Sequence, residues 1–395
     1  MGNRKVHRFR KIGEKLNKKA EYLAYLSRIF RFKASYVNFT KTIKQQVRQM
    51  PKLSKEMKAN IDDLWGGVKY HDYWYRWYNA IPQDREDRLF YTDVEDETAI
   101  VRQKNWYMPD FQYYCYVCET FANRVDCKAI DDKNMYDLYF RDVRQPQTLG
   151  RKIKGGYFDE KYRRIEETEI IDKIKNNGGA VLKIAKSSYG GKGIEFIDGS
   201  LSDEELKSIL RHRDGYVLQE KVKQHPQMAK LHPDSLNTVR TVTFRYKGEV
   251  HVLSTIVRFG IGGKKVDNIS SGGIFCGVKS NGSMTKYGYT NRAVVMEKHP
   301  TTGVPFAGTV VPNYEKVKQM VCELSNRFAE VSQLISWDIA INEEGEPVLI
   351  EVNLNYSGIG LLQIANGPLF GDLTKDVLKD IFSNPRLRRF NRIFH

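Results

Sequence analysis

Two carboxylates and an amide near the C-terminal end of the chain could together bind a metal ion. Asp338, Glu351 and Asn353 lie in residues 336–353, a stretch whose pattern is typical of a β-hairpin. If Glu344-Gly345 is the two-residue loop, Asp338 faces Glu351, and Asn353 lies two residues further on the same side. Opposed carboxylates repel each other unless a cation lies between them. Because three oxygen ligands suit Mg²⁺ better than zinc, the hairpin predicts a magnesium site and a bound nucleotide.

A glycine-rich loop earlier in the chain could cover phosphates. Residues 180–186 are typical of a short apolar strand that contains Lys183, and a second strand is expected from residue 194. Glycines let backbone N–H groups approach an anion, and a lysine supplies the compensating charge. The same loop fits a plain flexible turn, since its spacing matches neither of the common phosphate-binding fingerprints. The loop residues that we consider for nucleotide binding are Ser188, Gly190, Gly191, Lys192 and Gly193.

Two further segments add polar groups in an order that fits one nucleotide site. Residues 216–222 predict a short strand that ends in polar residues, and residues 237–246 predict a strand that begins at Asn237 and contains Arg240. An arginine on a buried face of a strand needs an anionic partner. A single nucleotide site would account for these groups together with Lys183, the glycine loop and the hairpin.

Length and composition set the outer limits. A chain of 395 residues is long enough for two or three domains, each with its own core. Five cysteines, without a charged-then-apolar signal segment, favour reduced thiols in the cytoplasm. No apolar run reaches the length that spans a membrane. We therefore expect a cytoplasmic protein.

The basic character belongs to the first 60 residues. They hold 17 Lys and Arg against three Glu, so they account for +14 of the net charge of +16. Their apolar spacing predicts two or three helices. One interpretation is a surface for acidic lipid at the inner face of the membrane or for another polyanion; the other is a helical appendage whose charged face is merely solvated. Nucleic acid is not expected, because no known binding motif accompanies the charge.

In order and spacing these motifs resemble the ATP-grasp superfamily, and within it the sugar-transfer-associated group. The resemblance spans roughly residues 115–370 and is carried by Asp132-Lys133, Leu182-Lys183-Ile184, Ser188–Gly193, Gln219–Val222, Asn237–Arg240, Asn268–Gly273, and Trp337-Asp338 with Glu351–Asn353. It implies an α+β fold, with two α+β subdomains clamping ATP, and it does not cover the basic N-terminal extension. The expected division is 1–65 for the extension, 66–150 for an N-terminal subdomain, 151–222 for a central lid subdomain and 223–395 for a C-terminal subdomain.

The resemblance also implies roles for individual residues. Lys133 and Lys183 would contact the ATP phosphates, and Asp338, Glu351 and Asn353 would hold magnesium, with two ions expected. Adenine would lie against the segment that contains Gln219, Glu220, Lys221 and Val222, and Asn237 belongs to the same nucleotide site. A carboxylate would attack the γ-phosphate to give an acylphosphate, which an amine converts to an amide. Lys183 would neutralise the transferring charge and Arg240 would stabilise the oxyanion.

Three alternatives to an ADP-forming carboxylate–amine ligase stay open. The same scaffold could phosphorylate a hydroxyl as a small-molecule kinase, or bind ATP without chemistry while docking on a glycan-assembly complex. The third alternative is a globular protein that binds no nucleotide. For the acid substrate, an amino acid or sugar acid, we consider a polar loop with Lys264, Asn268, Gly272 and Gly273. The link to polysaccharide or cell-surface glycan modification comes from the resemblance alone.

Overall fold

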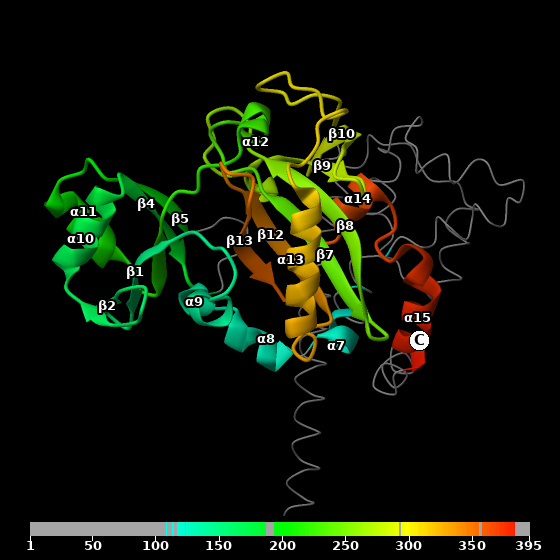
Figure 1. Ribbon diagram of the computed structural model, residues 1–395, viewed down its shortest axis with the longest axis horizontal. Helices are drawn as coiled ribbons and strands as arrows, with labels where there is room; N and C mark the ends of the chain where they lie inside the picture. The colour runs from blue at the N-terminus through cyan, green and yellow to red at the C-terminus, as the bar shows by residue number, and fades with distance from the viewer. Residues whose placement is uncertain are drawn as a thin grey trace, which may run out of the picture. The chain divides into compact units, whose positions relative to one another are not determined.

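The computed structural model describes residues 108, 113, 117–122, 124–186, 193–291, 294–354 and 358–383. Within these ranges no helix is both long enough and apolar enough to cross a membrane. The predicted basic helices of residues 1–65 lie outside the described part of the chain. The described elements form two α+β units, each built on its own antiparallel sheet (Figure 1).

The first sheet has six strands in the order β3-β2-β1-β6-β4-β5, and every neighbouring pair is antiparallel. Its helices α10 and α11 have apolar residues at helical spacing, such as Ile170 and Ile174 or Leu206 and Leu210, and these form a core against the sheet. Each helix begins at a capping box, with Ser202 and Glu205 in α11. The bounds are β1 Thr148–Ile153, β2 Gly156–Phe158, β3 Arg164–Ile165, α10 Glu167–Asn176, β4 Gly179–Ile184, β5 Ile194–Asp198, α11 Asp203–His212 and β6 Tyr216–Gln219.

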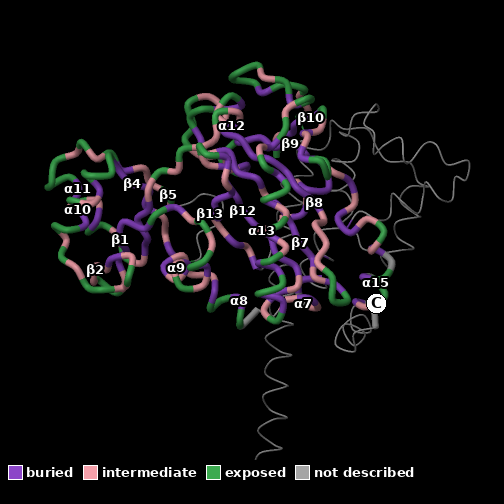
Figure 2. Tube along the Cα trace, in the orientation of Figure 1, coloured by how far each residue is buried: buried purple, intermediate pink, exposed green. Residues whose placement is uncertain are grey.

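The second sheet has seven strands, in the order β11-β10-β9-β8-β7-β12-β13, again antiparallel throughout. Its strands are β7 Val239–Tyr246, β8 Glu249–Phe259, β9 Ile274–Val278, β10 Met284–Thr290, β11 Val295–Met296, β12 Leu334–Ile341 and β13 Pro347–Asn353. The accompanying helices are α12 Pro226–Leu231, η3 Ile269–Ser271, α13 Tyr314–Arg327, α14 Gly360–Asn366, η4 Gly371–Leu373 and α15 Thr374–Ser383. Buried positions follow the strands, whereas the connecting loops carry most of the exposed ones (Figure 2).

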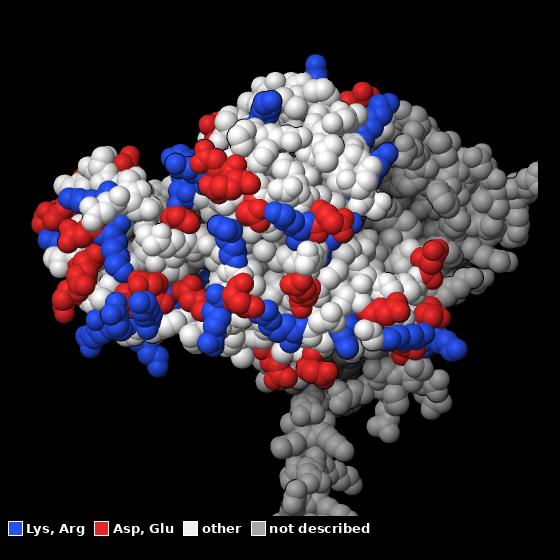
Figure 3. All heavy atoms as spheres, in the orientation of Figure 1, with Lys and Arg blue, Asp and Glu red and all other residues white. Residues whose placement is uncertain are grey.

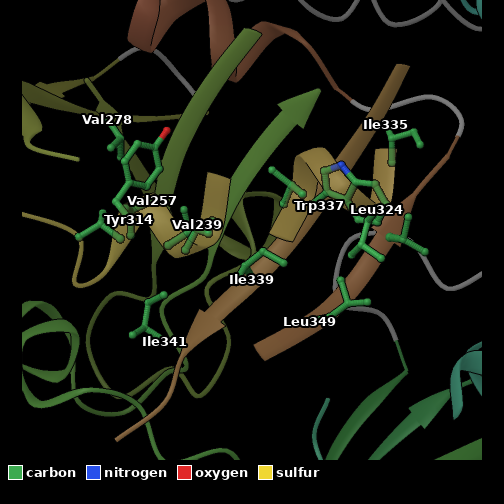
Figure 4. Close-up of a cluster of buried hydrophobic side chains, with 14 of the residues drawn as sticks. Val239, Val257, Val278, Tyr314, Leu324, Ile335, Trp337, Ile339, Ile341 and Leu349 are labelled. Carbon is green, nitrogen blue, oxygen red and sulfur yellow. The ribbon is translucent and has the colours of Figure 1, made fainter. Parts of the chain in front are cut away.

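The two faces of the second sheet differ in chemistry because side chains alternate along each strand. On one face α13 packs across β7, β8, β12 and β13. Figure 4 shows Trp337 and Ile339 of β12 in this core with Leu324 of α13. The indole N–H of Trp337 donates to Thr243 Oγ1 at 2.8 Å, which satisfies the one polar atom of that side chain. The opposite face carries Asp338, and α14 covers it along β8, β9 and β10.

The short elements before the first sheet belong to both units. They are α7 Cys118–Phe121, α8 Arg124–Ile130, η2 Lys133–Met135 and α9 Tyr136–Tyr139. Cys127, Tyr136 and Phe140 lie in the core of the second sheet, whereas the Lys133 backbone N–H donates to Ala185 O at the end of β4. Thus η2 lies at the junction of the units. The predicted boundaries at 150 and 222 stay predictions; the first sheet begins at Thr148.

The hairpin of β12 and β13 differs from the expected two-residue turn. Asn342 N donates to Glu346 O at 3.0 Å, so the loop has three residues, 343–345, and Gly345 adopts the left-handed φ of 82° that such a loop requires. This register pairs Ile339 with Leu349. A β-bulge at Ile350 then adds one unpaired residue, and Asp338 pairs with Glu351 after all. The predicted turn is wrong, whereas the predicted pairing is confirmed.

Charge on the face shown in Figure 3 is mixed, with Lys and Arg interspersed among Asp and Glu. Several of these side chains form exposed ion pairs, such as Lys316 with Glu346 and Arg327 with Asp142. Exposed pairs of this kind contribute little to stability. The functional charges therefore have to be sought where side chains are buried.

Candidate functional site

A lysine of η2 and a glutamate of β13 meet at the junction of the two units. Lys133 Nζ lies 2.8 Å from Glu351 Oε1, and the two side chains are 10% and 29% exposed. The lysine is held in place by its own turn, because Asp132 caps η2 by accepting from Asn134 N at 3.0 Å. Two residues predicted to contact phosphate and metal are therefore in direct contact.

Lys183 of β4 belongs to the same group of charges. Burial and, to a lesser extent, the nearby positive charge of Lys133 lower the pKa of its ammonium to about 8, and Glu351 opposes both effects. A bound anion would stabilise the charged form of this ammonium and raise its pKa. The three residues together are suited to bind phosphate oxygens.

The glycine loop follows the strand of Lys183 in the sequence, and only its last residue is described. Ser188, Gly190, Gly191 and Lys192 lie outside the described residues. Gly193 is described: its φ is 81°, and its carbonyl accepts from Ile184 N at 3.1 Å. A Cβ at Gly193 would lie 2.5 Å from Ile184 Cγ1, so only glycine fits there. The end of the loop is thereby pinned to the strand that carries Lys183.

Arg240 and Asp338 form a bidentate pair across β7 and β12. Arg240 Nε and Nη2 donate to Asp338 Oδ1 and Oδ2, each at 2.7 Å. Burial alone would raise the pKa of Asp338, but the two guanidinium groups of Arg240 and Arg258 hold it below its ordinary value. For Arg240, burial works to lower the pKa and the attraction of Asp338 raises it instead. The anionic partner predicted for Arg240 is therefore Asp338.

Two residues of this network were not found from the sequence, Arg258 and Asp267. Arg258 Nη2 donates to Asp338 Oδ2 at 3.1 Å and to Thr238 Oγ1 at 2.7 Å. Asp267 accepts from Thr238 N at 3.2 Å, and its Oδ2 lies 3.4 Å from Arg258 Nε. Arg258 carries the signal used for Arg240, a charge inside an apolar strand, and could have been found in the same way. Asp267 has no such signal.

The predicted metal ligands Asp338, Glu351 and Asn353 lie on one face of β12 and β13, and their oxygens could together bind a magnesium ion that arrives with a nucleotide. Asp338 Oδ1 accepts one hydrogen bond, so it keeps lone-pair capacity. Four cationic and four anionic side chains make the cluster formally neutral, so it has no net attraction for a bare cation. They are Lys133, Lys183, Arg240, Arg258, Asp131, Asp267, Asp338 and Glu351. In the described ranges, no group of three His, Cys, Asp or Glu side chains is arranged around a metal position.

The segment predicted to hold adenine connects the two sheets. Gln219 ends β6 and is buried, and its Nε2 donates to Pro146 O at 3.5 Å. Glu220 is tied to Gln147 through both backbone and side chain, at 2.9 and 3.0 Å. Lys221 is exposed and Val222 partly buried. Their contact with adenine stays a prediction.

Asn237 has a structural role in this structure. Its Nδ2 donates to the carbonyls of Met228 and His232, both at 2.8 Å, and its Oδ1 accepts from Ser235 Oγ at 3.0 Å. The side chain is completely buried. These bonds fasten the turn before β7, so the structure does not bring the Asn237 amide to the charged cluster.

The predicted substrate loop is compact and bonded to itself. Asn268 Oδ1 accepts from Ser270 N at 2.8 Å, and Lys264 Nζ donates to Ser271 O. Gly272 has a φ of 90°, and a Cβ at Gly273 would lie 2.6 Å from Asp267 O. Through Asp267 this loop is joined to Arg258 and so to Asp338.

The two α+β units meet at a buried cluster of acidic and basic side chains. This arrangement fits a nucleotide-binding class of protein. The chain belongs to the sugar-transfer associated ATP-grasp family, whose model matches residues 117–379. The expectation of an ATP-grasp fold is thereby confirmed. No curated protein matches the chain.

Solved structures with a similar fold include amino-acid ligases. D-alanyl-alanine synthetase A of Vibrio cholerae has 12% identity over 67% of each chain, with a TM-score of 0.38. D-alanine–D-alanine ligase of Bacillus anthracis has 15% identity over 69% of this chain and 72% of that one, with a TM-score of 0.37. L-amino acid ligase of Bacillus licheniformis has 13% identity, with a TM-score of 0.34, over 64% of this chain and 48% of the ligase. No functional conclusion follows from likenesses of this size.

Proposed function

We propose that this protein is an ATP- and Mg²⁺-dependent carboxylate–amine ligase that forms an amide through an acylphosphate and releases ADP. The observation that carries the proposal is the contact between Lys133 and Glu351 at 2.8 Å, beside Lys183 and the Arg240–Asp338 pair. It supports a site where phosphate-binding and metal-binding groups face one another. Membership in an ATP-grasp family supports ATP as the nucleotide.

The residues of the cluster divide the work of phosphoryl transfer. Lys133 and Lys183 would bind phosphate oxygens, and the lowered pKa of Lys183 would rise as an anion approaches. Glu351, Asp338 and Asn353 would hold magnesium, which when bound would offset the negative charge of the phosphates. Arg240 would share its guanidinium between Asp338 and the carboxylate of the acid, and so orient the attacking oxygen.

Water must be kept from the acylphosphate until the amine arrives. The glycine loop that ends at Gly193 is the candidate lid, since residues 188–192 adjoin the strand of Lys183. The acid substrate would lie near the 261–273 loop, whose Asp267 is joined through Arg258 to Asp338. An amino acid or a sugar acid fits this position, and the family supports a setting in polysaccharide or cell-surface glycan modification.

The test is product analysis by mass spectrometry. The protein is incubated with ATP, Mg²⁺, pooled amino acids and sugar acids, and hydroxylamine as a generic amine. Hydroxamates with ADP and phosphate are expected, and the hydroxamate mass names the acid. A phosphorylated metabolite without hydroxamate would refute the ligase in favour of a kinase. ATP binding without any product would favour a non-catalytic module that docks on a glycan-assembly complex, and Glu351→Gln serves as the inactive control.

A further inference from the structure

A serine and an asparagine beside the charged cluster have polar atoms that the described protein leaves without hydrogen bonds. Ser336 of β12 pairs directly with Asn353 of β13. Ser336 is completely buried, and neither its Oγ nor the buried Nδ2 of Asn353 has a hydrogen-bond partner among the described residues. A buried donor without a partner costs free energy, so adjacent ones require an explanation.

Their position on the sheet is that of the candidate site. Ser336 and Asp338 are two residues apart on β12, as are Asn353 and Glu351 on β13, so all four side chains lie on the face opposite the Trp337 core. Side chains of directly paired residues are about 5 Å apart at Cβ. The Ser336–Asn353 pair therefore forms the row next to Asp338 and Glu351, and Val242 of β7 lies on its other side.

Other buried hydroxyls of the second sheet are satisfied. Ser332 Oγ donates to Leu334 O at 2.8 Å, and Ser254 Oγ accepts from Asn366 Nδ2 at 2.9 Å. Thr255 Oγ1 bonds with Tyr314 at 2.7 Å. Two of the five buried side-chain atoms that lack partners in the described ranges fall on this one cross-strand pair. Other buried hydroxyls of this sheet thus have hydrogen-bond partners, whereas Ser336 Oγ and Asn353 Nδ2 have none among the described residues.

We propose that Ser336 Oγ and Asn353 Nδ2 form a donor pair for an anionic oxygen of the reacting group. Both atoms can donate a hydrogen bond, and their neighbour Arg240 adds a positive charge. The ligand oxygen belongs either to the γ-phosphoryl group or to the carboxylate of the acid. This inference rests on the proposed function and adds to it two named contacts at the site of transfer.

The test compares Ser336→Ala with Ser254→Ala, the same change two strands away on the same face of the sheet. Binding of Mg·ADP and of Mg·AMPPNP is measured by titration calorimetry, and thermal unfolding is measured without ligand. Ser336→Ala is expected to weaken Mg·AMPPNP about tenfold or more, with Mg·ADP unchanged and the midpoint of unfolding not lowered. Asn353→Asp, which keeps an oxygen and removes the N–H donor, is expected to weaken Mg·AMPPNP as well. Ser254→Ala should leave both affinities unchanged.

The outcomes separate the sources of the oxygen. If Mg·AMPPNP is unaffected but the KM of the acid found by the hydroxamate screen rises about tenfold, the oxygen is that of the carboxylate. Equal affinities and an equal KM would overturn the donor pair, as would equal weakening of Mg·ADP and Mg·AMPPNP or a lower unfolding midpoint in Ser336→Ala than in Ser254→Ala. If wild type binds neither nucleotide, the proposed function itself is refuted, and the donor pair with it.

Discussion

Lys133 Nζ and Glu351 Oε1 lie 2.8 Å apart although 218 positions separate them, and this contact joins η2 to the second sheet. The same turn is bonded to the first sheet through Lys133 N and Ala185 O. Tyr136, which follows η2, receives a hydrogen bond from Val352 N at 3.2 Å. Lys133 is therefore positioned by both units at once.

Replacement of Lys133 should weaken nucleotide binding. For Lys133→Met we expect Mg·AMPPNP to bind about tenfold to 100-fold more weakly, because hydrogen bonds to charged groups contribute about 1.5–3 kcal/mol. Titration calorimetry measures this. Lys186→Met is the matched control, since Lys186 is 69% exposed and contacts Asp132 instead. Equal affinities for the two variants would disprove the role of Lys133.

Lys183 should make nucleotide binding pH-dependent. Its pKa of about 8 leaves much of the amine neutral at pH 8, and a bound phosphate raises the pKa again. Mg·ADP binding should therefore take up protons at pH 8 and much less at pH 6.5, where the amine is already charged. Calorimetry in two buffers of different ionisation enthalpy gives the uptake. In Lys183→Met the uptake should vanish; uptake that persists there would assign it to another group.

Asp338→Asn should lower stability as well as activity. Asp338 is 1% exposed and neutralises Arg240 and Arg258, so loss of its charge leaves two buried guanidinium groups with reduced compensation. We expect a loss of about 3 kcal/mol in the free energy of unfolding. Urea unfolding measures it, and the partly exposed Glu351→Gln should cost less.

His299 should make stability depend on pH. Burial lowers its pKa below 6.5, and the neutral ring contacts Gly260 O through Nε2 at 2.9 Å. Because the pKa of His299 is lower in the folded state, the neutral ring contributes to the free energy of unfolding. This contribution is complete above about pH 6.5 and is lost as pH falls towards the folded-state pKa. Urea unfolding at pH 7.5 and 5.5 should show the loss. His299→Gln should flatten the profile and His212→Gln, at an exposed position, should not; a flat wild-type profile would contradict the assignment.

The sequence was enough to predict the strand that carries Lys183, because that strand is a short apolar run. The pairing of Asp338 with Glu351 was predicted from a two-residue turn, and it holds because the bulge at Ile350 offsets the longer loop. It did not reveal the fixed role of Asn237, whose partners Met228 and His232 come from a turn without a repeating pattern. Ser336 was passed over for another reason. A serine in a strand carries no chemical signal until the structure shows that its hydroxyl is buried and without a described partner.

The bulge at Ile350 determines which side chains of β13 face the apolar core. With strict alternation Leu349, Glu351 and Asn353 would share one face, and Glu351 would point at the apolar core in which Leu349 lies. Because Ile350 is left out of the strand pairing, Leu349 and Val352 both lie in that core. Glu351 and Asn353 lie on the other face. Deletion of Ile350 would therefore leave Leu349 and Glu351 on opposite faces by plain alternation, whereas insertion of one paired residue there would exchange the two sets. The face on which Glu351 and Asn353 lie thus depends on how many paired residues separate them from the turn.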